Sequence, residues 1–248
     1  GLIVNPVAGL GGPGAYKGSD LNWKDALAAG YTPTAPQRAT QFVHLVDNAV
    51  RWVSVPGIMG GDHLPPGCEL IGPDPKLTLG QTSREDTMQA ARAIRDAKVD
   101  LLCFLGGDGT AADIAKAVGD KQPCLGVPAG VKITSPVYAH DVAEAAWLVT
   151  MLRSGFETVM RDVTDLDETA YRTGHVDIEL KGNLRVPLSP AIPHGEVPPT
   201  HETSLPQRVR PVWQESAPDP PPRLRAAPVS PPDPAPIRRP PPPPARRP

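Results

Sequence analysis

The sequence predicts an α/β fold in which a parallel sheet is covered by helices on both faces. Short apolar runs, typical of buried strands, alternate along the chain with longer amphipathic segments, typical of helices. Turns rich in glycine follow most of the apolar runs. This alternation favours parallel strands joined by crossover helices. We therefore expect the turns to meet at the carboxyl edge of the sheet, where such folds bind ligands.

Each predicted element rests on a local pattern. Phe42, Val43 and Val46 recur at helical spacing, whereas the segment 52–56 is short and apolar and indicates a strand. Ser83 and Asp86 have the spacing of a capping box that starts a helix. We expect strands over 1–5, 52–56, 101–105, 123–128, 157–163 and 175–187, helices over 20–29, 34–50, 85–98, 111–118, 141–152 and 167–172, and a loop over 64–82.

The most informative stretch is the glycine-rich turn after the third predicted strand. Gly106, Gly107 and Gly109 surround Asp108, and Thr110 leads into a predicted helix. A strand, a glycine turn and a helix together present free backbone N–H groups at the positive end of the helix dipole, where phosphate binds. Phosphate repels a carboxylate, so Asp108 is better suited to take a proton from an attacking hydroxyl or to hold a metal.

Two further turns contain candidate phosphate contacts. Asn5 and Gly9 lie in the glycine-rich loop after the first strand, which is either a flexible connection or a second phosphate-facing loop. Lys132 follows the strand at 123–128, and the alternative for it is a solvated surface lysine. His63 and Cys68 are too isolated to predict a metal site, so no residue is assigned as a metal ligand.

The overall composition restricts the classes of partner. The formal net charge of −2 does not favour nucleic acid or an anionic membrane surface. The three cysteines form no C-x-x-C pair, and no apolar segment approaches the length of a membrane helix. No basic leader precedes the first apolar run. We expect a cytoplasmic protein with small-molecule partners.

The composition changes near residue 187. Most of the 34 prolines lie beyond this point, lysine is absent after Lys181, and hydrophobic periodicity ends. We expect an α/β nucleotide-phosphate-binding domain over 1–165, the start of a β-rich domain over 166–187, and a disordered proline- and arginine-rich tail over 188–248. The tail is interpreted as the product of a reading-frame shift, or as a genuine segment whose polyproline stretch docks on aromatic grooves.

Taken together, several motifs resemble the ATP-NAD kinase family. They are N-P-V-A-G-L-G-G at 5–12, P-G-I-M-G at 56–60, S-R-E-D-T at 83–87, G-G-D-G-T-A-A-D-I at 106–114 and G-V-P-A-G-V-K at 126–132. They look most like the branch that includes the acetoin-catabolism X protein and predicted ATP- or polyphosphate-dependent NAD kinases. The resemblance covers residues 1–187. It implies a Rossmann-like sheet of the NAD kinase and diacylglycerol kinase type, followed by a β domain that is largely missing.

The resemblance also implies an activity and the residues that carry it. The activity is phosphorylation of NAD to NADP, with ATP or polyphosphate as the donor and Mg²⁺ bridging the donor phosphates. Asp108 would be the catalytic base that deprotonates the 2′-hydroxyl of the adenosine ribose. The residues implied to bind the nucleotide phosphates are Asn5, Gly9, Gly106, Gly107, Gly109, Thr110 and Lys132.

Two departures from the family pattern leave the acceptor open. The V-P-A-G-V-K turn differs from the G-V-N turn of typical NAD kinases, and Ala112 stands where an arginine is expected in this branch. The alternatives are a kinase of another small hydroxyl substrate linked to acetoin catabolism, and an inactive remnant without its second domain. A sheet edge left bare by that missing domain would favour a homo-oligomer.

Overall fold

The computed structural model describes residues 1–10, 25–72, 77–129, 133–166 and 178–188. Lys132, the predicted helix over 167–172 and the predicted tail beyond Leu188 lie outside these ranges. None of the helices in the described part of the chain has the length and apolar character needed to cross a bilayer.

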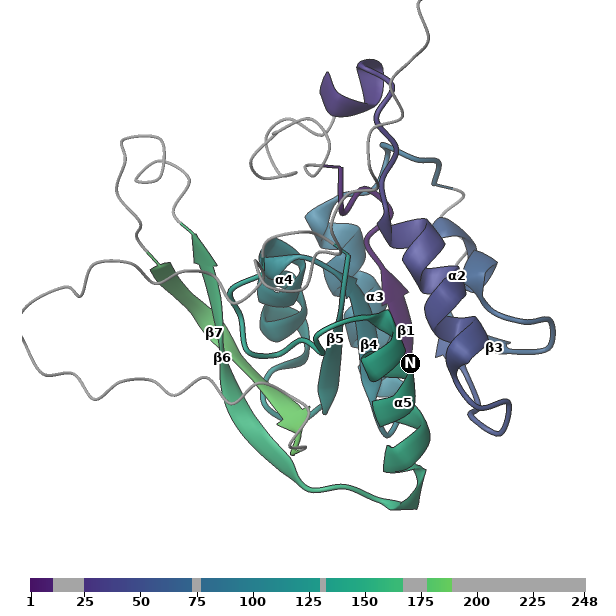
Figure 1. The fold of residues 1–248 in the computed structure, drawn as a ribbon, viewed down its shortest axis with the longest axis vertical. Helices are drawn as coiled ribbons and strands as arrows, with labels where there is room; N and C mark the ends of the chain where they lie inside the picture. Colours follow the sequence, from purple (N-terminus) through teal and green to yellow (C-terminus); the bar gives the residue numbers. More distant parts are fainter. Residues whose placement is uncertain (11–24, 73–76, 130–132, 167–177, 189–248) are drawn as a thin grey trace, which may run out of the picture. The chain divides into compact units, whose positions relative to one another are not determined.

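A five-stranded sheet, in which every pairing is parallel, forms the centre of the fold (Figure 1). Its strand order is β3-β2-β1-β4-β5. The order of the strands therefore reverses between β1 and β4, which are paired although they are far apart in the sequence. The strands are β1 (Leu2–Val4), β2 (Val53–Ser54), β3 (Glu69–Leu70), β4 (Leu102–Gly106) and β5 (Cys124–Pro128).

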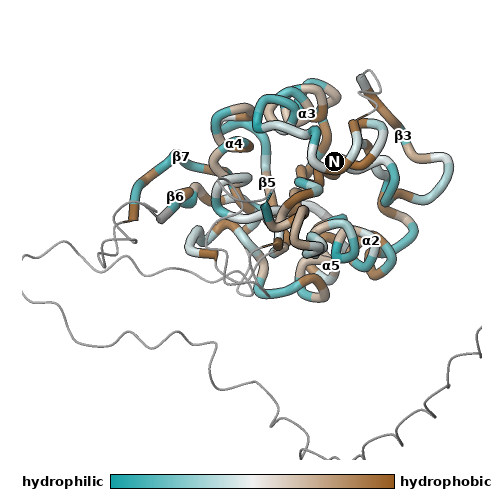
Figure 2. Tube along the Cα trace, turned by 90° about the horizontal axis from the view of Figure 1, so that it is seen from above, coloured by the Kyte–Doolittle hydropathy of each residue, from teal (hydrophilic) through white to brown (hydrophobic). Residues whose placement is uncertain are grey.

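Helices cover both faces of this sheet. Figure 2 shows α2 and α5 on one side of the central strands and α3 and α4 on the other, in agreement with the two buried clusters. The helices are α2 (Ala35–Leu45), α3 (Arg84–Asp96), α4 (Asp108–Val118) and α5 (Val142–Met151), and the short 3-10 turns are η1 (Gly57–Met59), η2 (Gly61–His63) and η3 (Leu152–Ser154).

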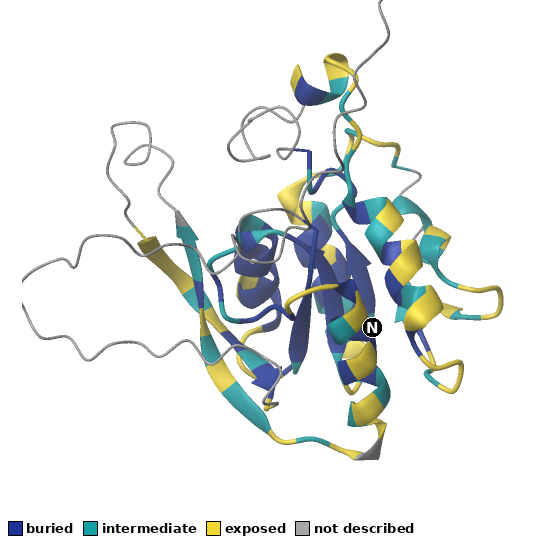
Figure 3. Cartoon of the chain, in the orientation of Figure 1, coloured by how far each residue is buried: buried dark blue, intermediate teal, exposed yellow. Residues whose placement is uncertain are grey.

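The alternation of side chains along the strands creates two separate cores. Leu102 and Phe104 of β4 pack on the side of α3 and α4, whereas Cys103 and Leu105 pack on the side of α2 and α5. All four side chains are buried, as are the central strands as a whole (Figure 3). A strand buried on both faces has no polar alternation, which explains why the sequence of β4 is a continuous apolar run.

A second, antiparallel sheet follows the α/β unit. It consists of β6 (Thr158–Leu166) and β7 (Ile178–Pro187). Val163, Leu184 and Val186 are fully buried and join the core on the side of α3 and α4, so this hairpin packs onto α4. The register shifts between Val163 and Thr164, which marks a β-bulge.

The structure confirms the predicted α/β class, the parallel sheet and the capping box of Ser83 and Asp86. The helix predicted over 34–50 is too long, because α2 ends at Leu45 and the backbone of Val46 is extended. Oδ1 of Asp47 accepts a hydrogen bond from the N–H of Ala49 at 2.7 Å. This local side-chain hydrogen bond stabilises a turn at a position where the apolar spacing alone suggested a helix.

Two other predicted boundaries were wrong. The helix predicted from residue 111 begins at Asp108, so Asp108 lies in the first turn of α4 and not in the preceding loop. The loop predicted over 64–82 contains β3, whose two residues, Glu69 and Leu70, are both exposed. A two-residue edge strand that buries neither side chain has no hydrophobic pattern for sequence analysis to detect.

We expect the Ser83→Ala substitution to lower the free energy of unfolding by about 1 kcal/mol, because α3 would lose its N-cap. The Ser83 side chain accepts from the N–H of Asp86, and Oδ2 of Asp86 accepts from the N–H of Ser83 at 2.8 Å. Urea unfolding followed by circular dichroism measures the change. Ser83→Thr keeps the capping hydroxyl and is the matched control, and equal losses in both variants would contradict the capping role.

Candidate functional site

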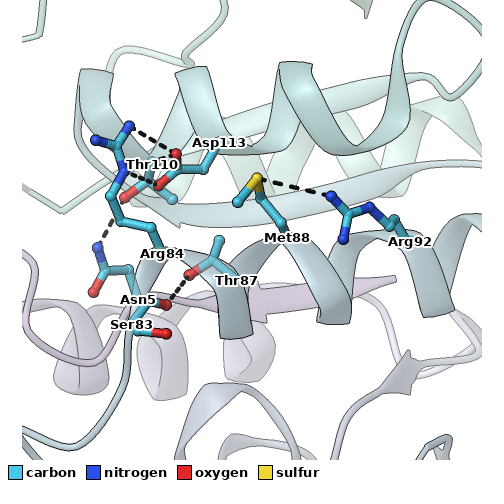
Figure 4. Close-up of polar contacts among 8 residues, drawn as sticks. All are labelled: Asn5, Ser83, Arg84, Thr87, Met88, Arg92, Thr110 and Asp113. Atoms are coloured by element: carbon cyan, nitrogen blue, oxygen red, sulfur yellow. Dashed lines mark hydrogen bonds and ion pairs between the residues drawn. The ribbon is translucent and has the colours of Figure 1, made fainter.

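The carboxyl ends of β1 and β4 meet where the strand order reverses, which is the place where doubly wound sheets bind ligands. Asn5 follows β1, and Gly107 is the N-cap of α4 after β4. Nδ2 of Asn5 donates a hydrogen bond to Oγ1 of Thr110 at 2.9 Å (Figure 4). This bond links the loop after β1 to the first turn of α4.

The turn between β4 and α4 is tight. A side chain at Gly106 would overlap that of Thr110, so the close approach of the first helical turn to the strand requires glycine. By helix geometry the first N–H groups of α4 have no partner within the helix. Within the described part of the chain, no side-chain capping bond is made at this end of α4, where the N-cap residue is Gly107. The glycine-rich turn therefore leads into a helix N-terminus whose backbone donors face the carboxyl edge of the sheet.

The turn after β5 joins the same site. The N–H of Ala129 donates to the carbonyl of Gly106 at 3.2 Å, and the carbonyl of Ala129 accepts the hydroxyl of Thr34 at the start of α2. Nη1 of Arg38, one turn further along α2, donates to the carbonyl of Pro128 at 2.8 Å. The predicted convergence of the turns is therefore confirmed for those after β1, β4 and β5.

Gly9 fits closely into this junction. Its φ of +86° lies in the left-handed region, and a Cβ atom there would overlap both Oγ1 of Thr34 and the carbonyl oxygen of Ala129. Gly9 therefore allows the loop after β1 to approach the loop after β5. Its role in the structure is to permit this contact between two backbones.

Asp108 is a buried carboxylate, only 7% exposed. Its Oδ2 accepts from the N–H and the hydroxyl of Thr134, both at 2.7 Å, and its Oδ1 accepts from the N–H of Ser135 at 3.1 Å. These three donors compensate for the loss of water around the negative charge. The carboxylate is thus turned toward the segment after β5, and it does not cap its own helix.

Tyr138 contacts the turn between β4 and α4 through its hydroxyl and contacts β4 itself through its ring. Its hydroxyl donates to the carbonyl of Gly107 at 2.6 Å, and its ring packs edge-on against Phe104 with centroids 5.3 Å apart. A side chain at Gly126 would overlap the Tyr138 ring, so glycine in β5 makes room for it. Burial raises the pKa of Tyr138 well above its ordinary value, and the nearby negative charges of Asp108 and Asp165 raise it further.

Arg84 connects α3 to α4 (Figure 4). Its guanidinium donates to the Asp113 carboxylate through Nε at 3.0 Å and Nη2 at 2.8 Å, in a two-pronged ion pair. Both residues line a groove of about 600 Å³ between α3, α4 and β7, together with Met88 and Ala112. Asp113 lies on α4 more than a turn after Asp108, so this ion pair braces the two helices against each other.

The structure brings together most of the residues that sequence analysis singled out. Asn5, Asp108 and Thr110 belong to one hydrogen-bonded junction. Gly9, Gly106, Gly107 and Gly109 lie in its turns and in the first turn of α4, and Lys132 falls outside the described residues. Sequence analysis did not identify the residues that hold the junction from other segments, namely Arg38, Thr134, Ser135, Tyr138 and Thr164.

The fold and the site define a class of protein. A parallel sheet of this strand order, with a glycine-rich turn into a helix at the point of reversal, is typical of α/β proteins that bind nucleotides. Residues 1–154 match the ATP-NAD kinase N-terminal domain, and the chain belongs to this family of phosphotransferases. No curated protein and no solved structure is significantly similar to the chain.

The Gly9→Ala substitution should destabilise the protein much more than Gly67→Ala. Both glycines have a similar φ, +86° and +90°, so both substitutions carry the left-handed backbone penalty of about 1–2 kcal/mol. Only at Gly9 does the added methyl group meet other atoms, because nothing lies within 4 Å of the corresponding position at Gly67. We expect at least about 2 kcal/mol of additional loss at Gly9, measured by urea unfolding. Equal losses would show that the loop can move away from Ala129.

Tyr138→Phe should lower stability by about 1–2 kcal/mol below pH 10, because the hydrogen bond to the Gly107 carbonyl is lost. The raised pKa of Tyr138 means that its stabilising contribution is fully present below its unfolded value of 10.0 and is lost as the pH rises toward the folded value. The gap in stability between parent and variant should therefore narrow above pH 10. Unfolding curves of the two proteins between pH 7 and pH 11 test this, and a constant gap would contradict it.

Proposed function

We propose that this protein phosphorylates NAD to NADP, with ATP or polyphosphate as the phosphoryl donor. Membership of the ATP-NAD kinase family supports this activity. The observation that carries it is the arrangement at the end of β4. The buried carboxylate of Asp108 lies in the first turn of α4, and the backbone N–H groups of that turn face the carboxyl edge of the sheet. Phosphoryl transfer needs such a combination of a proton acceptor and phosphate-binding donors.

The phosphate-binding part is built mainly from backbone. The turn formed by Gly106, Gly107 and Gly109 brings the N-terminus of α4 to the carboxyl edge of the sheet, and Thr110 is fixed there by Asn5. Donor phosphates placed at this end of the helix are stabilised by free N–H groups and by the helix dipole. Lys132 is proposed to add a positive charge next to this cradle, since it follows Ala129 by only a few residues.

Asp108 is proposed as the base. Among the residues that the structure describes, Oδ1 accepts one hydrogen bond, from Ser135, whereas Oδ2 accepts two from Thr134, so Oδ1 has the greater remaining capacity to accept a proton. In the reaction Oδ1 takes the proton of the ribose 2′-hydroxyl. The 2′-oxygen then forms a bond to the terminal phosphorus of the donor, and the bridging P–O bond breaks. The leaving group is ADP or a shortened polyphosphate.

Mg²⁺ is proposed to accompany the donor. Among the residues that the structure describes, no three His, Cys, Asp or Glu side chains lie together as a metal site. In phosphoryl-transfer sites Mg²⁺ is usually held through substrate phosphates together with one or two carboxylates. When bound it would neutralise charge on the donor phosphates, and none of the steps given for Asp108 passes through the ion.

The alternative of an inactive remnant is favoured by a separate observation. The far end of the β6–β7 hairpin carries exposed apolar side chains, with Ile178 54% and Leu180 59% exposed. A missing β domain would leave such a surface uncovered. This alternative predicts no turnover with any donor, whereas the proposed function predicts NADP formation.

Asp108→Asn should reduce NADP formation by at least about 100-fold, because the proton acceptor is removed. It should also lower stability by about 1–3 kcal/mol. The amide oxygen can replace Oδ2 opposite Thr134, but the amide nitrogen then faces the N–H of Ser135, and two donors oppose each other. A coupled assay of NADP formation and a urea unfolding curve measure the two effects.

Asp113→Asn is the matched control, because it removes another buried carboxylate from the same helix without touching the proposed base. We expect it to lose stability and to retain the parental rate of NADP formation. Parental activity in the Asp108→Asn variant would contradict the proposed role of Asp108. A fully folded parent without activity toward any donor would favour the inactive remnant.

A further inference from the structure

We propose that Ser135 is a positioning residue that couples the β6–β7 hairpin to the Asp108 carboxylate. The inference rests on the role proposed above for Asp108. Ser135 is buried, with 4% of its surface exposed, and it lies in the segment after β5. Its backbone N–H donates to Oδ1 of Asp108 at 3.1 Å, while its side chain contacts the hairpin.

The Ser135 hydroxyl forms hydrogen bonds with the backbone of β6 on the edge that does not pair with β7. It donates to the carbonyl of Thr164 at 2.8 Å and accepts from the N–H of Thr164 at 3.0 Å. Both backbone groups of one strand residue are thus satisfied by one hydroxyl, as a paired strand would satisfy them. The position of β6 at Thr164 therefore fixes the position of Ser135.

This contact lies at the bulge of the hairpin. Val163 pairs with Gly182 and Thr164 pairs with Leu180, so the extra residue of the bulge lies in β7, opposite this point of β6. Val163 on one side of the bulge is fully buried against α4, whereas Thr164 faces the segment that contains Thr134 and Ser135. Consecutive residues of β6 point to opposite sides of the strand, so Val163 joins the core while Thr164 faces the segment that donates to Asp108.

Thr134 provides a second connection along the same path. Its hydroxyl donates to Oδ2 of Asp108 at 2.7 Å and lies 3.2 Å from Oγ1 of Thr164. Each oxygen of the carboxylate therefore meets a donor that is itself held by β6. A proton acceptor must be held within a fraction of an ångström of its productive position, so this support determines how well Asp108 can act.

Ser135→Ala should lower kcat for NADP formation by on the order of 10-fold or more, because the carboxylate loses part of its support. The KM values for NAD and for the donor should stay within about twofold, because Ser135 is not proposed to contact either substrate. The matched control is Ser54→Ala. Ser54 is also fully buried, and its hydroxyl donates to the carbonyl of Leu2 at 2.8 Å, so this hydrogen bond does not involve Asp108.

Amide hydrogen exchange measured by NMR on the full chain gives a readout that does not require turnover. Removing the Ser135 hydroxyl should reduce the protection of the N–H groups of Thr134 and Ser135, which donate to Asp108, by about fivefold or more. Ser54→Ala should leave this protection unchanged. A general loss of stability would instead lower protection throughout the core strands in both variants.

The outcomes separate the two proposals. If Asp108→Asn abolishes NADP formation while Ser135→Ala keeps the parental kcat and amide protection, the positioning role is overturned and the proposed function stands. If Asp108→Asn keeps full activity, the proposed role of Asp108 fails, and if the parent is inactive, the proposed function fails. In either case the exchange data alone decide the coupling. If Ser135→Ala does not fold, Ser135→Cys replaces it, and unchanged protection in that variant would overturn the inference.

Discussion

The buried carboxylate of Asp108 is the constraint on which the geometry of the site depends. A carboxylate removed from water is costly unless donors replace the water, and here all three donors come from Thr134 and Ser135. The segment after β5 must therefore lie against the start of α4. Tyr138, a few residues further on, closes the same contact by donating to the carbonyl of Gly107. The segment after β5 is thus hydrogen-bonded both to the Asp108 side chain and to the Gly107 carbonyl in the turn before α4.

The direction of this carboxylate also determines what the helix N-terminus can bind. An aspartate in the first turn often accepts a hydrogen bond from the N–H groups of its own helix, which would occupy the donors that phosphate needs. The side chain of Asp108 does not cap α4 and faces the neighbouring segment instead. The negative charge still benefits from the helix dipole, while the backbone donors stay available. The proposed proton acceptor and the proposed phosphate-binding N–H groups therefore do not compete with each other.

Sequence analysis predicted those parts of the structure that depend on local pattern. The apolar run of β4, the glycine turn that follows it and the capping box at Ser83 are all visible within a few neighbouring residues, and the parallel sheet confirms the inference drawn from their alternation. The support around Asp108 could not be predicted in this way. Ser135 and Thr164 are common polar residues, and the role proposed for them depends on the fold bringing β6 against the segment after β5. The early end of α2 was missed for a related reason, because hydrogen bonds of the Asp47 backbone and side chain hold the turn there, and apolar spacing does not reveal them.

The β6–β7 hairpin has two parts with different physical roles, and the bulge at Thr164 divides them. On one side Val163, Leu184 and Val186 are buried against α4 and complete the core of the α/β unit. On the other side Ile178 and Leu180 are largely exposed. The predicted domain boundary at residue 165 falls close to this division, although β6 itself continues through it. Because the buried part fixes Thr164, and Thr164 holds Ser135, the α/β unit needs the first part of the hairpin to support its own carboxylate. The support of Asp108 therefore depends on the buried part of the hairpin and not on its exposed part.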